Sequence, residues 1–320
     1  TEVFLNGLMA GVLYSLVALG FVLIYKASGI FNYAQGVMAL FAALTLVGIM
    51  DGQVPFSHLI NAILGTDIHH FGWHLPAFFA ILLTMVVMVG LAWLVQVIIF
   101  RHLVNQEPII LFMATIGLAY FMEGLGDMMW GADIKKLDVG LPQGLNLWID
   151  EATYNIFDYG FFIDNLDIVA TIIAALLVGV LVAFSQYTKE GRAMRAVADD
   201  HQAALSVGVS LSFIWVMVWS VAGFVALVAG IMWGTKSGVQ FSLSLIALKA
   251  LPVLMLGGFT SIPGAIIGGL IIGVGEKLFE FAIGPLIGGA TENWFAYVLA
   301  LLFLVFRPQG LFGEKIIERV

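Results

Sequence analysis

The 320-residue sequence contains no cysteine and few charged residues, and both shortages narrow the range of possible proteins. The absence of cysteine excludes disulfides, thiolate metal sites and cysteine nucleophiles. Charged residues make up 11% of the chain, whereas hydrophobic residues make up 61%. Because soluble proteins use roughly 45–50% apolar residues, this composition indicates a membrane protein.

Several sequence motifs of enzymes and nucleotide-binding proteins are also missing. The chain has no G-x-x-x-x-G-K-[ST] loop, so it cannot hold ATP phosphates by that means. Serine-nucleophile, Rossmann and haem patterns are absent, and no basic face suggests nucleic-acid binding. The first residues, TEVFLNGLMAG, lack a basic region, which predicts a retained helix rather than a cleaved signal.

Long apolar runs recur along the chain, and about 20 apolar residues suffice to cross a bilayer core as a helix. The runs lie at 3–25, 36–50, 75–100, 108–130, 166–187, 213–233, 246–257, 264–283 and 293–306. They predict an all-α polytopic membrane protein, a single transmembrane domain over 1–320 with about eight or nine transmembrane or half-membrane helices. Polar or glycine-rich breaks near 26–36 and 257–264 are the places to look for a pathway, because irregular backbone at membrane depth needs protein or water beside it.

The placement of lysine and arginine predicts the orientation, since cytoplasmic loops are richer in both. With nine spans, one side holds Lys26, Arg101, Lys189, Arg192, Arg195, Arg307, Lys315 and Arg319. The other side holds Lys135, Lys136, Lys236 and Lys277. The first side is therefore predicted to be cytoplasmic, with the C-terminus on it and the N-terminus outside. The segment 131–165 then forms an external loop.

The segment 188–210 is charged and rich in alanine, unlike the apolar runs on either side of it. Its residues favour a short helix over 189–205 at the cytoplasmic surface, with Arg192, Arg195 and Asp199 on one face. One interpretation is a solvated connector. The other is a docking helix, in which small alanines allow a partner to approach closely and the charges set specificity.

Four stretches together resemble the ABC importer permeases of the branched-chain amino acid type. They are GLMAGVLYSLVALGFVLIYKASGIFNYAQG, GRAMRAVADDHQAALSVGV, LKALPVLMLGGFTSIPGAIIGGLIIGVGE and FRPQGLFGEK. They occur in the family's order and cover the chain nearly end to end. Tyr33 stands where phenylalanine is usual and Thr260 where glycine is common, which leaves the substrate in doubt.

The resemblance implies a set of partners and no cofactor in this chain, because ATP is bound by partner subunits. It implies a homologous second permease, two cytoplasmic ATPase subunits, a periplasmic or extracellular substrate-binding protein and the lipid of a bacterial or archaeal cytoplasmic membrane. The segment 188–210 then becomes the coupling helix that contacts the ATPase. Its candidate coupling residues are Gly191, Arg192, Arg195, Asp199, Ala203 and Gly208.

The two breaks supply the candidate pathway residues. These are Asn32, Tyr33, Gln35, Gly36, Gly257 and Gly258. Asparagine and glutamine side chains buried in lipid need partners, so they serve either as hydrogen bonds between helices or as a polar lining. The glycines beside Pro263 suit either a tight turn between short helices or a gating element.

Two further clusters admit several interpretations. Glu123 and Asp127 share a helical face, which fits a wet interfacial position or a proton relay, and Lys249 is a possible partner for a membrane acid. A cluster of three histidines, at positions 69, 70 and 74, fits a loop or helix end better than a metal site. His69, His70 and His74 stand in the stretch DIHHFGWHL.

The leading hypothesis is a permease subunit of an ABC importer, with no catalytic residues, for a small polar solute such as a branched-chain amino acid. Urea, amides and small organic acids are alternatives within the same importer type. A stand-alone secondary transporter or channel, driven by Glu123, Asp127 and Lys249, is the hypothesis from another class. No motif in the sequence supports a membrane enzyme.

Overall fold

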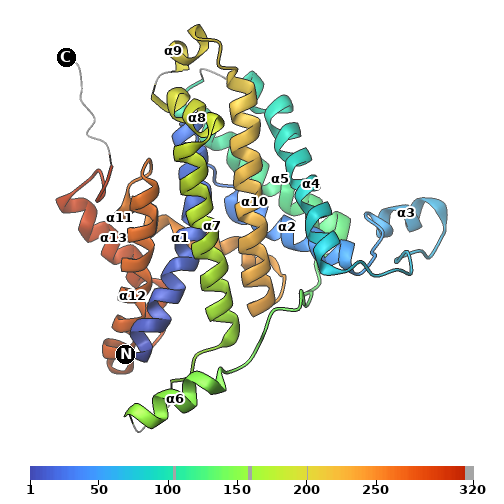
Figure 1. Ribbon diagram of the computed structural model, residues 1–320. Coiled ribbons are helices and arrows are strands. Elements are labelled where there is room, and N and C mark those ends of the chain that lie inside the picture. The colour runs from blue at the N-terminus through green and yellow to red at the C-terminus, as the bar shows by residue number, and fades with distance from the viewer. Residues whose placement is uncertain (104–105, 158–160, 200, 314–320) are drawn as a thin grey trace. The chain divides into compact units, whose positions relative to one another are not determined.

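The computed structural model describes residues 1–103, 106–157, 161–199 and 201–313. Within these ranges the chain forms thirteen α-helices and three short 3₁₀ helices, and its β structure consists of isolated bridges (Figure 1). The prediction of an all-α polytopic membrane protein is confirmed. Lys315 and Arg319, which entered the charge count above, lie outside the described residues.

Five helices in the described ranges are long and apolar enough to cross a membrane. They are α1 (Glu2–Ser28), α4 (Ala77–Ile98, continued by the 3₁₀ helix η1, Phe100–His102), α5 (Pro108–Trp130), α7 (Asn165–Tyr187) and α10 (Leu211–Ser237). A sixth candidate is a broken pair, in which η2 and α11 (Phe241–Leu245 and Ile246–Gly257) meet α12 (Ile262–Ile287) at a bend of 114°. Two shorter apolar helices, α2 (Gln35–Met50) and α13 (Phe295–Phe306), complete the apolar set. Each of the nine apolar runs in the sequence is therefore helical, and both predicted breaks are present.

Four short helices lie between these apolar elements. They are α3 (Ser57–Leu64), α6 (Leu147–Phe157), α8 (Lys189–Asp199) and α9 (His201–Ser206). The segment expected to form a helix over 189–205 is helical over Lys189–Asp199 and His201–Ser206, and residue 200 lies outside the described residues. The loop 131–165 includes α6, a helix too short to stand out by hydrophobic length.

The chain divides into two compact units that interleave in sequence. Unit 1 consists of Thr1–Val22, Leu141–Ala183 and Leu248–Val320, and unit 2 of Leu23–Gly140 and Phe184–Ala247. Helices α1 and α7 each contribute residues to both units. The two units are described separately below.

Helix α2 forms the centre of unit 2 and is buried along nearly its whole length by contacts with α10, α4 and α5. Small residues make the close approach possible: a Cβ on Gly230 of α10 would lie 2.5 Å from the Ala39 carbonyl oxygen of α2. The Phe100 ring of η1 stacks on Trp219 of α10 with 4.8 Å between centroids. Such van der Waals packing is the main source of helix association in lipid.

In unit 1, the N-terminal part of α1 packs against α12 through glycines on both helices. A Cβ on Gly7 would lie 2.7 Å from Val274 Cα, and a Cβ on Gly11 would lie 2.8 Å from Leu270 Cα. The backbones of the two helices are thus in direct contact. This geometry is typical of membrane helices with small residues four positions apart.

Candidate functional site

The break between α1 and α2 places two buried amide side chains in unit 2. Asn32 Nδ2 donates to Gln35 Oε1 at 3.2 Å, and Gln35 Nε2 donates to the Ala222 carbonyl oxygen of α10 at 3.3 Å. Asn32 Oδ1 accepts from the Ala34 backbone N–H at 3.1 Å. Both side chains are fully buried. They are therefore paired, as amides in an apolar interior must be, and they tie the start of α2 to α10.

Tyr33 and Gly36 flank these amides in different environments. Tyr33 is exposed, and its backbone N–H donates to Thr115 Oγ1 of α5 at 3.1 Å. Gly36 is buried, and a Cβ there would overlap the Ser244 carbonyl oxygen and lie 2.7 Å from Ala247 Cβ. The break is thus held to α5 on one side and to η2 and the start of α11 on the other.

Replacing Gln35 with leucine is expected to destabilise the fold, because the buried Asn32 amide would keep only the weaker sulfur acceptor of Met38 at 3.4 Å, and the hydrogen bond to the Ala222 carbonyl oxygen would be lost. Leaving a buried polar group unpaired costs about 1–3 kcal/mol, so the thermal midpoint of the purified chain should fall by several degrees. Thr45→Val, on the same helix, is the matched control, since Thr45 Oγ1 is buried and has no partner within the described residues. An equal effect of both variants would show that the Asn32–Gln35 pair contributes nothing.

The break between α11 and α12 is a tight turn in unit 1. Gly258 has φ 102°, a left-handed conformation that favours glycine. Gly257 lies against Gly264, so closely that a Cβ on either would overlap the backbone of the other. Ser261 caps α12 by accepting from the Gly264 N–H at 3.1 Å.

The C-terminal stretch after α13 closes over this turn. Leu311 N–H donates to the Leu256 carbonyl oxygen at 2.8 Å, and Phe312 N–H donates to the Gly257 carbonyl oxygen at 3.2 Å. The motif that contains Gly257 and the motif that contains Leu311, which are separated in sequence by α12 and α13, therefore contact each other. The candidate pathway residues belong to both units, with Gly257 and Gly258 in unit 1 and the other four in unit 2.

The charged segment before α10 belongs to unit 2 and is anchored by its apolar side. Met194 and Val197 are buried, and α8 packs on α10. A Cβ on Gly191 would overlap the Phe184 and Ser185 carbonyl oxygens, so the turn from α7 into α8 requires glycine.

The candidate coupling residues of this segment differ in exposure. Arg192 and Ala203 are exposed, whereas Arg195 is half-buried and donates to the Gln186 carbonyl oxygen at 3.5 Å. Gly208 follows α9 with φ 87° and open space around it. Asp199 is the last residue of α8.

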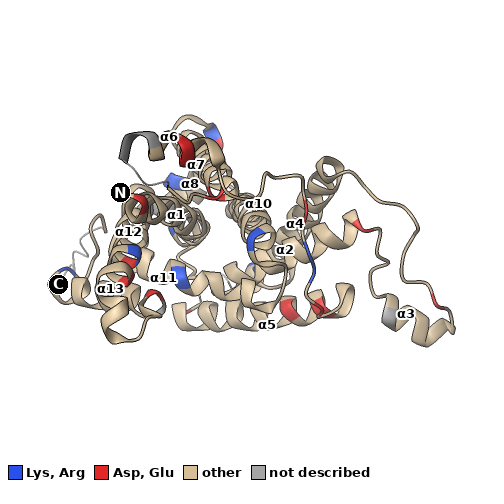
Figure 2. Cartoon of the chain, turned by 90° about the horizontal axis from the view of Figure 1, so that it is seen from below, with Lys and Arg blue, Asp and Glu red and all other residues tan. Residues whose placement is uncertain are grey.

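Lys249 is paired with the carboxylate of Glu276, which is not among the candidate residues predicted from the sequence. Its Nζ lies 2.6 Å from Glu276 Oε1 of α12 and 2.9 Å from the Glu292 carbonyl oxygen. Lys277 Nζ lies 2.7 Å from Glu292 Oε1. Glu276 and Lys277 are neighbours in sequence, so acidic and basic side chains lie side by side on α12 (Figure 2).

Glu280 extends this group of charges, since its carboxylate accepts from the Thr291 N–H at 2.6 Å and from the Thr291 hydroxyl. Three charged residues within one apolar helix could have indicated this cluster in the sequence. They are Glu276, Lys277 and Glu280 of α12. Their partners, Lys249 for Glu276, Glu292 for Lys277 and Thr291 for Glu280, lie outside α12, so they could not be assigned from the sequence alone.

Glu123 and Asp127 line a different cavity, of about 270 Å³, in unit 2. The cavity is also bordered by Asp133 and Gln240, near the end of α5. Glu123 is half-buried and Asp127 exposed. The two acids thus have a solvent-accessible position at the helix end, and Lys249 is paired with Glu276 instead.

The histidine cluster and Lys135 lie outside the spans. His69 Nε2 lies 3.0 Å from Asp67 Oδ1, and no three His, Asp or Glu side chains of the described chain are arranged to hold a metal ion. Lys135 Nζ donates to Gln53 Oε1 at 2.7 Å. Burial lowers the pKa of Lys135, although nearby acids partly oppose this shift.

Known proteins similar to this chain are membrane transport components. A family model described as "Branched-chain amino acid transport system / permease component" matches residues 3–307. The high-affinity branched-chain amino acid transport system permease protein LivH of Escherichia coli K12 is 27% identical over 318 residues, covering 98% of this chain and 96% of that protein. The corresponding protein BraD of Pseudomonas aeruginosa is 27% identical over 325 residues, with the same two coverages.

Proposed function

Because this multi-pass membrane chain belongs to the family of branched-chain amino acid transport permeases, we propose that it forms the translocation pathway of an ABC importer for a small polar solute. A branched-chain amino acid is the first candidate solute. The observation that carries the proposal is the family match, which runs from the start of α1 to the end of α13. The likeness to LivH and BraD covers 98% of this chain, which supports the same proposal.

The partners follow from the type of transport system. A permease component of an ABC system works with ATPase and substrate-binding components, and the permease is not itself catalytic. We assign to this chain a homologous second permease, two ATPase subunits on the cytoplasmic side and a binding protein on the periplasmic or extracellular side. Urea, amides and small organic acids remain alternative solutes for the same assembly.

The orientation follows from the distribution of basic residues. The end of α4 with Arg101 and the segment with Lys189 and Arg192 carry the positive charge expected of the cytoplasmic side. The N-terminus then lies outside the cytoplasmic membrane of the cell and the C-terminus inside. In this orientation the loop 131–165 faces the binding protein.

The buried amides and the two helix breaks are the proposed supports of the pathway. Asn32 and Gln35 fix the start of α2, while Gly257 and Gly258 allow the sharp turn before α12. The hypothesis of a stand-alone transporter required Lys249 to act with Glu123 and Asp127. The pairing of Lys249 with Glu276 instead favours the importer over that hypothesis.

The proposal is tested by transport into proteoliposomes that contain the permease pair, its ATPases and its binding protein. Uptake of labelled leucine should require ATP on the side of the membrane that carries the ATPases, opposite the binding protein. Unlabelled isoleucine or valine should reduce this uptake. Urea and acetamide competitions separate the alternative solutes. Uptake driven by an ion gradient through the purified chain alone would contradict the importer function.

Substituting Ala203 with tryptophan is expected to abolish most of the substrate-stimulated ATP hydrolysis of the reconstituted complex. Ala203 is exposed on α9, and coupling between ATPase and membrane helices needs contacts that differ between the two states. The bulky ring would hold the ATPase away from α8 and α9. Arg192→Glu should weaken stimulation as well, because Arg192 is exposed and its charge would be reversed.

The matched control for this prediction is Ala175→Trp. Ala175 is also an exposed helical alanine, on α7, outside both the segment 188–210 and the loop proposed to face the binding protein. Stimulated hydrolysis should be close to that of the unaltered complex in the control. If Ala203→Trp and the control behave alike, the segment 188–210 is a solvated connector and not the coupling helix.

A further inference from the structure

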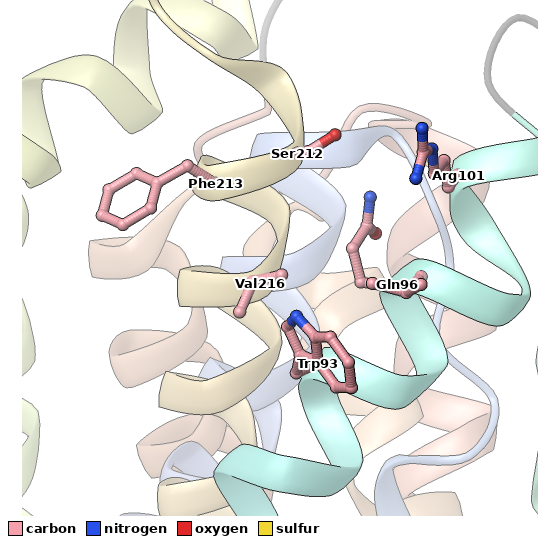
Figure 3. A pocket seen from close by; sticks show the side chains of 7 residues that line it. Trp93, Gln96, Arg101, Ser212, Phe213 and Val216 are labelled. Atoms are coloured by element: carbon pink, nitrogen blue, oxygen red, sulfur yellow. The ribbon is translucent and has the colours of Figure 1, made fainter.

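A cavity of about 360 Å³ lies between the C-terminal end of α4 and the N-terminal end of α10, both in unit 2 (Figure 3). The lining residues come from these two helices and from η1. They are Trp93, Gln96, Val97, Arg101, Ser212, Phe213 and Val216. None of them belongs to the candidate pathway or to the coupling segment.

One end of the cavity is suited to an anion. Figure 3 shows the Arg101 guanidinium and the Ser212 hydroxyl around the same end of the cavity, and no ion pair within the described ranges involves Arg101. Helix α10 begins here, after Ser210, whose side chain does not cap it. The first N–H groups of a long helix lack acceptors within the helix and attract negative charge.

A buried amide inside the cavity requires a hydrogen-bond donor. Gln96 is only 2% exposed, and its Oε1 has no hydrogen-bond partner within the described residues. Its side chain points from α4 into the space between the two helices, below Arg101 (Figure 3). A buried acceptor without a partner is unfavourable, so a ligand that supplies an O–H or N–H beside an anionic group would satisfy it.

The other end of the cavity is apolar and continues onto a lipid-facing surface. Trp93 and Val216 border it, and Trp93 is half exposed. The outer side of α4 carries large exposed apolar residues along its length. They include Phe78, Phe79, Leu82, Val86 and Val89. A ligand with a polar head and an alkyl chain therefore matches the whole site.

We propose that this cavity binds one anionic phospholipid whose headgroup carries a hydroxyl donor, as in phosphatidylglycerol. The phosphate lies between Arg101 and the first N–H groups of α10. A headgroup hydroxyl donates to Gln96 Oε1, and an acyl chain follows Trp93 along α4. Basic pockets between membrane helices are known to bind such headgroups on the cytoplasmic side, where anionic lipids and positive residues gather.

A bound lipid would act on the segment that precedes α10. Helix α8 packs on α10, and the Phe100 ring of η1 stacks on Trp219. A phosphate that joins Arg101 to the start of α10 would therefore fix the base of the 188–210 segment. The lipid site is independent of the solute, so it stands whether the importer carries amino acids or urea.

The experiment measures retained lipid by native mass spectrometry on the full chain, delipidated in detergent and then mixed with either phosphatidylglycerol or phosphatidylmethanol. The methanol headgroup leaves the same anionic phosphodiester but no hydrogen-bond donor, so phosphatidylglycerol should bind more tightly. Arg101→Gln should lower the affinity for both lipids by about fivefold. Gln96→Met should remove the preference between them and leave the affinity for phosphatidylmethanol unchanged.

Two further variants test whether the lipid occupies this cavity. Lys189→Gln removes an exposed lysine of unit 2 that does not line the cavity, and it should not change binding. Val216→Trp should exclude the lipid by filling the cavity from α10, which tests the site even if a Gln96 variant fails to fold. Equal binding of the two lipids, unchanged binding in Arg101→Gln or Val216→Trp, or displacement of the lipid by millimolar inorganic phosphate would overturn the proposal.

Discussion

Replacing Lys249 with methionine is expected to lower the stability of the chain by about 3–5 kcal/mol, since it leaves a buried carboxylate without its cation. Glu276 is 1% exposed, whereas the Lys249 side chain is 27% exposed. After the substitution, Glu276 Oε1 would retain only the Tyr14 hydroxyl at 3.4 Å, and Oε2 already has no partner within the described residues. The thermal midpoint of the purified protein should fall by about 10 °C.

Replacing Glu276 with neutral glutamine should lower the stability of the chain less than Lys249→Met does. In Glu276→Gln the Lys249 ammonium keeps the Glu292 carbonyl oxygen at 2.9 Å and its partial access to water. The double variant, Lys249→Met with Glu276→Gln, removes both charges and should be more stable than Lys249→Met alone. A double variant as unstable as the sum of the two single ones would show that the groups do not interact.

This ion pair also shows where sequence analysis succeeds and where it stops. Hydrophobic length located the apolar helices, because about 20 residues are needed to cross lipid and the chain has few charges to interrupt them. In the sequence, Lys249 stood out only as a possible partner for a membrane acid. Glu276 could not be identified as the partner, because the pairing depends on the 114° bend between α11 and α12.

The candidate site was predicted in part for a similar reason. Asn32 and Gln35 were selected as amides that must be paired at membrane depth, and both are paired. The sequence allowed either helix–helix hydrogen bonds or a polar lining, and Ala222 as an acceptor on α10 became visible only in the fold. The short helix α6 was missed because its 11 residues do not form a long apolar run, the pattern from which the helices were predicted.

The glycines of α1 and α12 lead to the second large effect. Gly7 and Gly11 are four residues apart on α1, and Gly269 and Gly273 are four residues apart on α12. A Cβ on Gly273 would lie 2.5 Å from both Gly11 Cα and the Gly7 carbonyl oxygen. These are backbone atoms, so the contact can be relieved only by moving a whole helix.

Gly273→Leu is therefore expected to prevent α1 from packing on α12 and to abolish recovery of monodisperse protein. Leucine is a good helix former, so the loss cannot be attributed to helix propensity. Separation of the helices would also break the hydrogen bond from Ser15 Oγ to the Ile266 carbonyl oxygen, now 3.1 Å long. Gly273→Ala adds only the Cβ and should still lower the thermal midpoint, because overpacking costs about 1–3 kcal/mol.

The matched control is Gly179→Leu on α7, which also belongs to unit 1. Gly179 is an exposed glycine inside a helix, and a Cβ there would meet nothing within 4 Å. Since glycine is about 1 kcal/mol less favourable than alanine in a helix, this variant should be as stable as the unaltered chain or more stable. Size-exclusion chromatography and thermal unfolding of the variants, side by side, provide the comparison. If Gly273→Leu is recovered as well as Gly179→Leu, the backbone contact between α1 and α12 does not hold unit 1 together, and α1 must be retained by other contacts.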